Sequence, residues 1–128
     1  MLVMIVRTKG KRVSAVFSAD WHIRDTKPIC RLDNFLETQS EKLAFIVSIC
    51  NKYEVPLYIA GDVTHHWKLS PNLITLLYTI LMRLVKKGYA IFGNHDLPQH
   101  NMDNAFLSGL YTLGATGAIS ILEKTMEK

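Results

Sequence analysis

Three short polar clusters in this chain combine carboxylate, imidazole and amide side chains that can ligate a metal ion. They are Asp20-Trp-His22, Gly61-Asp62-Val-Thr-His65-His66 and Gly93-Asn94-His95-Asp96. These oxygen and imidazole nitrogen donors are suited to Mn, Fe or Zn, and the clusters contain no thiolate ligand. A carboxylate can bridge two ions, and two closely spaced ions can clamp a phosphate and activate water. The clusters are therefore a candidate site for metal-assisted chemistry.

Each cluster begins where an apolar run stops. The runs have the composition of strands and cover Val13–Ser18, Leu57–Ala60 and Tyr89–Phe92. Side chains two residues apart in a strand share a face, so Asp20 and His22 can converge on one ion. Gly61 and Gly93, which precede Asp62 and Asn94, let the backbone turn sharply at the site.

Helices are predicted between the strands, over residues 34–53, 71–87 and 103–113. A hairpin from Leu2–Val6 to Val13–Ser18 and a last strand at Ala118–Leu122 complete the pattern. Strands that alternate with helices predict an α/β fold with a largely parallel sheet flanked by helices. In such sheets, sites form beyond the carboxyl ends of the strands, where the three clusters lie.

The second helix carries the clearest start and stop signals. Ser70 is a good N-cap and Pro71 suits the first helical position. Lys86 and Lys87 would face the negative end of the helix, and Gly88 would take a left-handed cap.

Each cluster also has an ordinary explanation. An isolated Asp-x-His is common by chance, and the glycine-containing clusters could be turns. Trp21 and Trp67 could stack on a base, although packing is the commoner role. His66 and His100 could be stray ligands, but exposed loop histidines are the simpler interpretation. Three clusters in order, each at a strand exit, are hard to obtain by accident.

The three clusters resemble the first three signature motifs of the calcineurin-like metallophosphoesterases. The resemblance extends from about Val13 to about Leu122, and Gly-Asn-His-Asp is its most specific part. Within the family the chain looks closest to the SbcD-like DNA exonucleases. Two features carry that finer resemblance, His65 in the second motif and Pro71 at the start of the next helix.

The resemblance implies a role for each matching residue. Asp20 and His22 would bind a first metal, Asp62 would bridge two metals, and Asn94 would bind the second through its amide oxygen. The metal would be a divalent ion, Mn first, with Fe or Zn as alternatives.

The resemblance also implies three residues that act on the phosphate. His95 would contact the scissile phosphate, stabilising charge or protonating the leaving oxygen. Asp96 would orient His95, and His65 would help to position the phosphate.

The chain departs from the family pattern after the third motif. The full pattern adds a further histidine and a Gly-His-x-His motif, whereas this sequence has no histidine after His100. We therefore expect residues 1–128 to form a single, incomplete domain, the first half of the family's α/β sandwich, with one metal or none. The first hypothesis is an enzyme that hydrolyses phosphodiesters, as in DNA, or phosphomonoesters. The alternative is a non-catalytic, truncated half-domain that serves as a binding or assembly module.

Composition sets the remaining expectations. A net charge of +4 over 128 residues permits a polyanionic substrate without requiring one. Cys30 and Cys50 form no CxxC pair, which favours free thiols and a cytoplasmic location. No apolar run is long enough for a membrane span. The strands are apolar on both faces, so we expect a second copy or a partner chain to cover part of the sheet.

Overall fold

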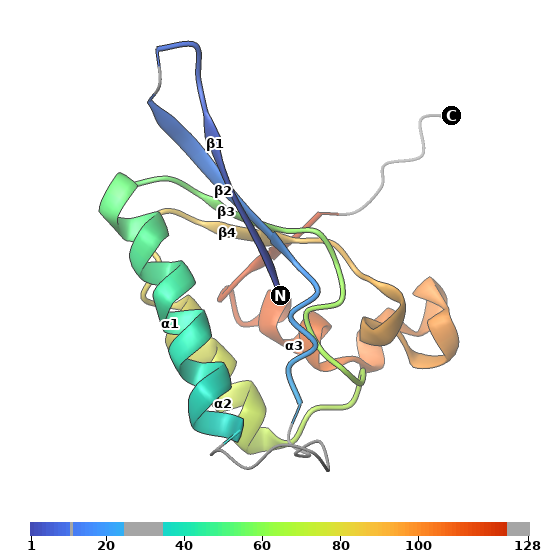
Figure 1. Ribbon diagram of the computed structural model, residues 1–128. Helices are drawn as coiled ribbons and strands as arrows, with labels where there is room; N and C mark the ends of the chain where they lie inside the picture. Colours follow the sequence, from blue (N-terminus) through green and yellow to red (C-terminus); the bar gives the residue numbers. More distant parts are fainter. Residues whose placement is uncertain (11, 25–34, 123–128) are drawn as a thin grey trace, which may run out of the picture.

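A computed structural model describes residues 1–10, 12–24 and 35–122 (Figure 1). Five strands within these residues form one sheet in the order β1-β2-β3-β4-β5. Their bounds are β1 (Leu2–Arg7), β2 (Val13–Ala19), β3 (Leu57–Ile59), β4 (Gly88–Ala90) and β5 (Ser120–Ile121). β1 is antiparallel to β2, and every other neighbouring pair is parallel. The predicted α/β fold with a largely parallel sheet is confirmed.

The expected N-terminal hairpin is present. Val3 pairs with Ser18 and Met4 with Phe17, and the register shifts between Val6 and Arg7. The turn end of this hairpin extends beyond the helices in Figure 1. β1 is therefore an edge strand that is exposed along most of its length.

The helices all lie on one side of the sheet (Figure 1). They are α1 (Phe35–Tyr53), α2 (Pro71–Leu81) and α3 (Gly109–Ala115), with short 3-10 turns η1 (Asn94–Asp96), η2 (Pro98–His100) and η3 (Met102–Leu107). The core forms between these helices and the sheet face that carries Val16, Leu57 and Ile59. Burial of these apolar side chains is the main force that holds the helices to the sheet.

The opposite sheet face is not covered by any described element. Phe17, Tyr58 and Tyr89 stack in a row across β2, β3 and β4, with ring centroids 5.0 and 5.1 Å apart. Ile91 and Leu122 flank the row and are 44% and 46% exposed. We call these five residues the open face. The helices therefore leave one face of the sheet uncovered, and this face is the part of the sheet that we expected a second chain to cover.

The start of α2 is as predicted. The Oγ atom of Ser70 accepts a hydrogen bond from the Leu73 amide at 3.2 Å, and Pro71 occupies the first turn. Ser70 therefore satisfies one of the amides that have no partner within the helix.

The predicted end of this helix was wrong. α2 stops at Leu81 instead of continuing to residue 87, so Lys86 and Lys87 lie outside it. The side chain of Asn51 donates to the Arg83 carbonyl at 2.8 Å and accepts from the Val85 amide at 2.9 Å. These bonds from the end of α1 satisfy backbone groups that would otherwise continue the helix. Gly88 opens β4 instead of capping α2.

The predicted helix over 103–113 is divided in two. Ser108 has an extended conformation between η3 and α3, and its Oγ atom accepts from the Tyr111 amide at 3.1 Å. A serine that caps α3 therefore ends one turn and begins the next helix. α3 also continues past the predicted end at residue 113, so Gly114 lies inside the helix.

Cys50 is a buried free thiol, and burial raises its pKa to about 11. Cys30 lies outside the described residues. Within the described ranges, no helix has the length and apolar character needed to cross a bilayer.

Candidate metal and phosphate site

The segment after β2 runs beside the segment after β3. The amides of His22 and Ile23 donate to the carbonyls of Asp62 and Val63, both at 3.0 Å, and the His65 amide donates to Ile23 at 2.9 Å. Parallel pairing thus continues past the ends of the two strands. It places His22 directly beside Asp62, although the two are far apart in the sequence.

Asp96 fixes the third segment, which follows β4, to the second. This side chain is fully buried, and its carboxylate accepts from the Thr64 amide at 2.8 Å, from Thr64 Oγ1 at 2.9 Å and from the Val63 amide at 3.3 Å. It also accepts from the Gly93 amide at 2.8 Å. A buried carboxylate with this many donors is well satisfied, so the two loops are held in one relative position.

Gly61 and Gly93 are both needed at the site, for different reasons. Gly61 has a left-handed φ of +92°, as the predicted sharp turn requires. Gly93 has an ordinary φ of −98°. A Cβ atom at Gly93 would lie 2.3 Å from both the backbone nitrogen and Oδ1 of Asp62. The sequence-based explanation for Gly93 was therefore wrong, because this glycine provides space for Asp62.

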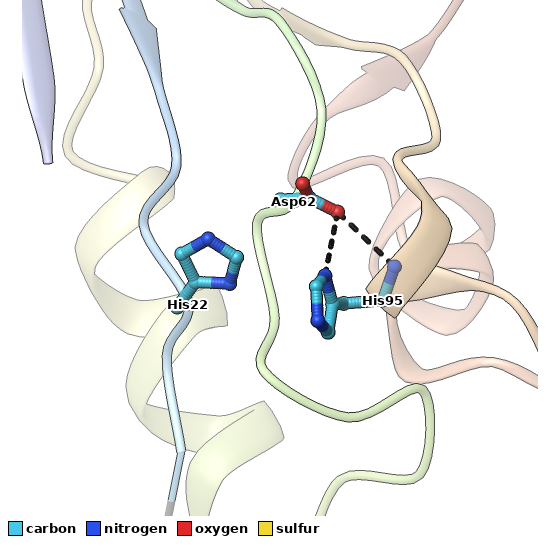
Figure 2. Close-up of side chains that lie close together, drawn as sticks. All are labelled: His22, Asp62 and His95. Atoms are coloured by element: carbon cyan, nitrogen blue, oxygen red, sulfur yellow. Dashed lines mark hydrogen bonds and ion pairs between the residues drawn. The ribbon is translucent and has the colours of Figure 1, made fainter.

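His22, Asp62 and His95 converge from three separate strand exits (Figure 2). Each offers one possible ligand atom, and these atoms all lie within 4.8 Å of one another. The backbone amide and Nδ1 of His95 both donate to Asp62 Oδ1, at 3.1 and 3.3 Å. We call these three residues the ligand cluster.

The surroundings of Asp62 favour its charged form. Partial burial raises its pKa, but the hydrogen bonds from the backbone and ring of His95 and the nearby His95 and His22 lower it, and the net pKa lies below the ordinary value. Asp62 is therefore a carboxylate at neutral pH, which is the form that binds cations.

The ligand cluster fits a divalent metal ion. Nδ1 of His22 is buried and has no hydrogen-bond partner among the described residues. A buried polar atom without a partner costs free energy, and coordination is one way to satisfy an imidazole nitrogen. Two imidazoles and a carboxylate are also the donors expected for Mn, Fe or Zn.

The other predicted metal ligands lie at the margins of the cluster. Asp20 is exposed, and its Oδ1 is 3.9 Å from Nε2 of His22. Asn94 begins η1, next to His95, and its carbonyl accepts from Nδ1 of His100 at 2.9 Å. Asp20 and Asn94 therefore each lie next to a member of the cluster, on two different segments, and their roles as ligands stay predictions.

His65, which was predicted to position the phosphate, lies against the cluster. Its ring stacks on His95 with centroids 5.9 Å apart and meets the edge of His22 at 6.2 Å. Arg24 Nη1 donates to His65 Nε2 at 3.3 Å. Partial burial, followed by the charges of Arg24 and the neighbouring histidines, lowers the pKa of His65. The neutral ring is therefore favoured, with Nε2 as an acceptor.

Sequence reasoning missed Arg24. The signal was its spacing, because Arg24 stands two residues after His22 and shares the alternation that brings Asp20 and His22 together. Thr64 was also missed, since nothing in the sequence shows that a threonine will bind a buried aspartate.

Three residues of the site have left-handed backbone conformations. The φ angles are +56° at Asp20, +47° at His22 and +51° at Asp62. Such conformations are unfavourable for residues other than glycine and tend to occur at functional sites. Here they lie at the points where each strand turns its side chains toward the cluster.

Trp21 has the simpler of its two predicted roles. Trp21 is buried and its Nε1 donates to Ser18 Oγ at 2.6 Å, so it packs in the core. His66 is an exposed loop residue, and His100 is an exposed residue at the end of η2.

The fold and the site together define a class, an α/β protein with a candidate metal site at the carboxyl edge of its sheet. The family model for the calcineurin-like phosphoesterase domain matches residues 14–121. The chain belongs to this family, whose domain is associated with metal-dependent hydrolysis of phosphate esters. A search of curated proteins found no match to the chain.

Proposed function

We propose that this chain is a metal-dependent phosphoesterase whose preferred substrates are phosphodiesters, with DNA as the leading candidate. One observation supports the proposal most strongly, the convergence of His22, Asp62 and His95 from three strand exits to within 4.8 Å. The family match supports hydrolysis of a phosphate ester in general.

The proposed metal site is built around Asp62. Asp20, His22 and Asp62 hold one divalent ion, and Asp62 with Asn94 offers a second, weaker position. Manganese is the proposed metal, with iron or zinc as alternatives. When bound, the ion supplies positive charge at the phosphate and a Lewis acid for the attacking water.

Three residues of the chain then act on the phosphate. His95 contacts it and stabilises charge or protonates the leaving oxygen. Asp96 positions His95 indirectly. Its carboxylate accepts from the Gly93 amide at the start of η1 and from the Val63 and Thr64 amides, and this fixes the turn that carries His95. His65, stacked on His95, positions the phosphate.

Hydrolysis assays test this function. The chain with Mn²⁺ is offered bis(p-nitrophenyl) phosphate, p-nitrophenyl phosphate and a DNA oligonucleotide, and calorimetry measures Mn²⁺ binding. Asp62→Asn should lower metal-dependent hydrolysis at least about 100-fold, since a metal contributes several kcal/mol. Asp103→Asn, which removes an exposed carboxylate in η3, is the matched control. Equal losses in both variants would refute the site.

A second candidate function is a non-catalytic assembly module, and the open face favours it. A contiguous exposed apolar surface is commonly a site of association. A second copy is the simplest occupant, because the Phe17–Tyr58–Tyr89 row can pack against its own symmetry mate. Metal binding without hydrolysis of any of the three substrates would favour this module over the enzyme.

A further inference from the structure

A pocket of about 320 Å³ opens beside the ligand cluster. His65 forms part of its wall and stacks on His95, so the pocket and the cluster share a side chain. Arg24 and His65 also line a second hollow that contains Asp20 and His22. The Arg24–His65 contact is therefore the boundary between the candidate metal site and the pocket.

The floor of the pocket is apolar. Ile23, Leu69 and Leu73 line it, and all three belong to the buried core. A flat group could rest against these apolar side chains. A volume of this size is at the lower end of the range for small-molecule sites.

The rim of the pocket is cationic. Arg24 and Lys68 contribute guanidinium and ammonium groups, and no acidic residue is among its lining within the described chain. His66 also lines the rim, and its ring packs on Trp67 with centroids 5.4 Å apart. Cations and the rings of His65 and His66 beside an apolar floor match a ligand that has both a phosphate and a planar base.

We propose that this pocket binds the nucleotide unit next to the phosphate that is hydrolysed. The base would rest on Ile23, Leu69 and Leu73, and the neighbouring phosphate would contact Arg24 and Lys68. The inference rests on the proposed function and narrows its substrate class to oligonucleotides. A lone phosphomonoester would leave the pocket empty.

The test measures how tightly the full chain binds a fluorescein-labelled single-stranded oligonucleotide. Fluorescence anisotropy gives the affinity at several salt concentrations, and no turnover is required. Arg24→Gln with Lys68→Gln should weaken binding about 10-fold or more and reduce the slope of log affinity against log salt by about 1 to 2. Lys68→Gln alone should produce about half of the change in slope. It leaves the Arg24–His65 contact intact, and circular dichroism verifies folding of each variant.

The matched control removes the same charge elsewhere. Lys86→Gln with Lys87→Gln neutralises two exposed lysines that line a different hollow. An equal loss of affinity in this control would overturn the pocket, as would an unchanged affinity in the Arg24/Lys68 variant.

Two further outcomes separate the ligand classes. An abasic oligonucleotide should bind the wild-type chain several-fold more weakly than the intact one, because the base is lost from the apolar floor. A phosphoserine peptide and a dinucleotide are compared as competitors of the labelled oligonucleotide. Equal competition by the two would overturn the assignment of the pocket to nucleotides. Failure to hydrolyse any of the three substrates would refute the proposed function, whereas the anisotropy results decide the pocket separately.

Discussion

Gly93 and Asp62 approach each other so closely that only a hydrogen fits between them. Moving the backbone of Asp62 away would disturb its pairing with the segment after β2, because the Asp62 carbonyl accepts from the His22 amide at 3.0 Å. Any side chain at position 93 must therefore displace the segment that carries Asp62 into the ligand cluster.

We expect Gly93→Ala to lower the free energy of unfolding by about 2–3 kcal/mol, within the range for overpacked sites. Urea denaturation measures the change. Gly10→Ala is the control, since a Cβ at Gly10 meets nothing within 4 Å, and it should change stability by about 0.5 kcal/mol or less. A neutral Gly93→Ala would show that the two segments are not held together.

His65 gives the site a predicted pH dependence. Its pKa is lowered in the folded state, so folding favours the neutral ring. A group with a lowered folded pKa contributes stability above its unfolded value and loses it as pH falls toward the folded value. For histidine the loss should begin below about pH 6.5.

Thermal melts of the metal-free chain at pH 7.5 and pH 5.5 test this. His65→Gln should reduce the fall in Tm between the two pH values. His100→Gln, which changes a histidine outside the cluster, serves for comparison. A pH dependence that is the same in wild type and His65→Gln would contradict the prediction.

At the scale of elements, Asp96 joins the loop after β3 to the loop after β4. Asp96→Asn places an amide group among donors that need an acceptor, and we expect a loss of about 3 kcal/mol in the free energy of unfolding. Thr64→Val removes one hydrogen bond to the same carboxylate and should cost about 1–2 kcal/mol. Urea unfolding of both variants gives the comparison. An Asp96→Asn loss no larger than that of Thr64→Val would show that the backbone donors contribute little.

The elements that could be predicted from sequence are those with local signals. The apolar runs at β2, β3 and β4 and the Ser70-Pro71 start of α2 are local patterns, and all were found. The end of α2 could not be found this way, because the Asn51 side chain that bonds Arg83 and Val85 belongs to another helix. The division of residues 102–115 at Ser108 was visible as a possible N-cap, but the pattern of apolar residues concealed it.

The candidate site follows the same rule. His22, Asp62 and His95 were identified because each follows a strand in a parallel sheet. Arg24 and Thr64 were missed because their roles depend on contacts with His65 and Asp96 from other segments. Sequence patterns therefore predicted which loops meet, and the side-chain contacts between those loops required the structure.

At the scale of the whole molecule, the helices cover one face of the sheet and the open face is exposed to solvent. Phe17 is 40% exposed at the end of the aromatic row and lies on β2, which also leads into the site. Association through this face would therefore act on the same strand that positions Asp20 and His22.

We expect the chain to dimerise at micromolar concentration through the open face. Phe17→Lys should raise the dimer dissociation constant at least about 30-fold, because replacing an interface aromatic ring with a charged side chain costs about 2 kcal/mol. Phe45→Lys, at an exposed position on α1 on the helical side, should not. Sedimentation velocity distinguishes the outcomes, and a wild-type chain that remains monomeric would refute the dimer.

The left-handed backbone at Asp20, His22 and Asp62 sets a limit on how this protein can be improved by selection. Each conformation stores about 1–2 kcal/mol of strain that a glycine would relieve. A selection for thermal stability alone would therefore favour glycine at an exposed position such as Asp20, and the resulting chain would melt at a higher temperature while losing a proposed ligand. Stability and activity are opposed at these positions, so directed evolution of this chain has to select for both at once.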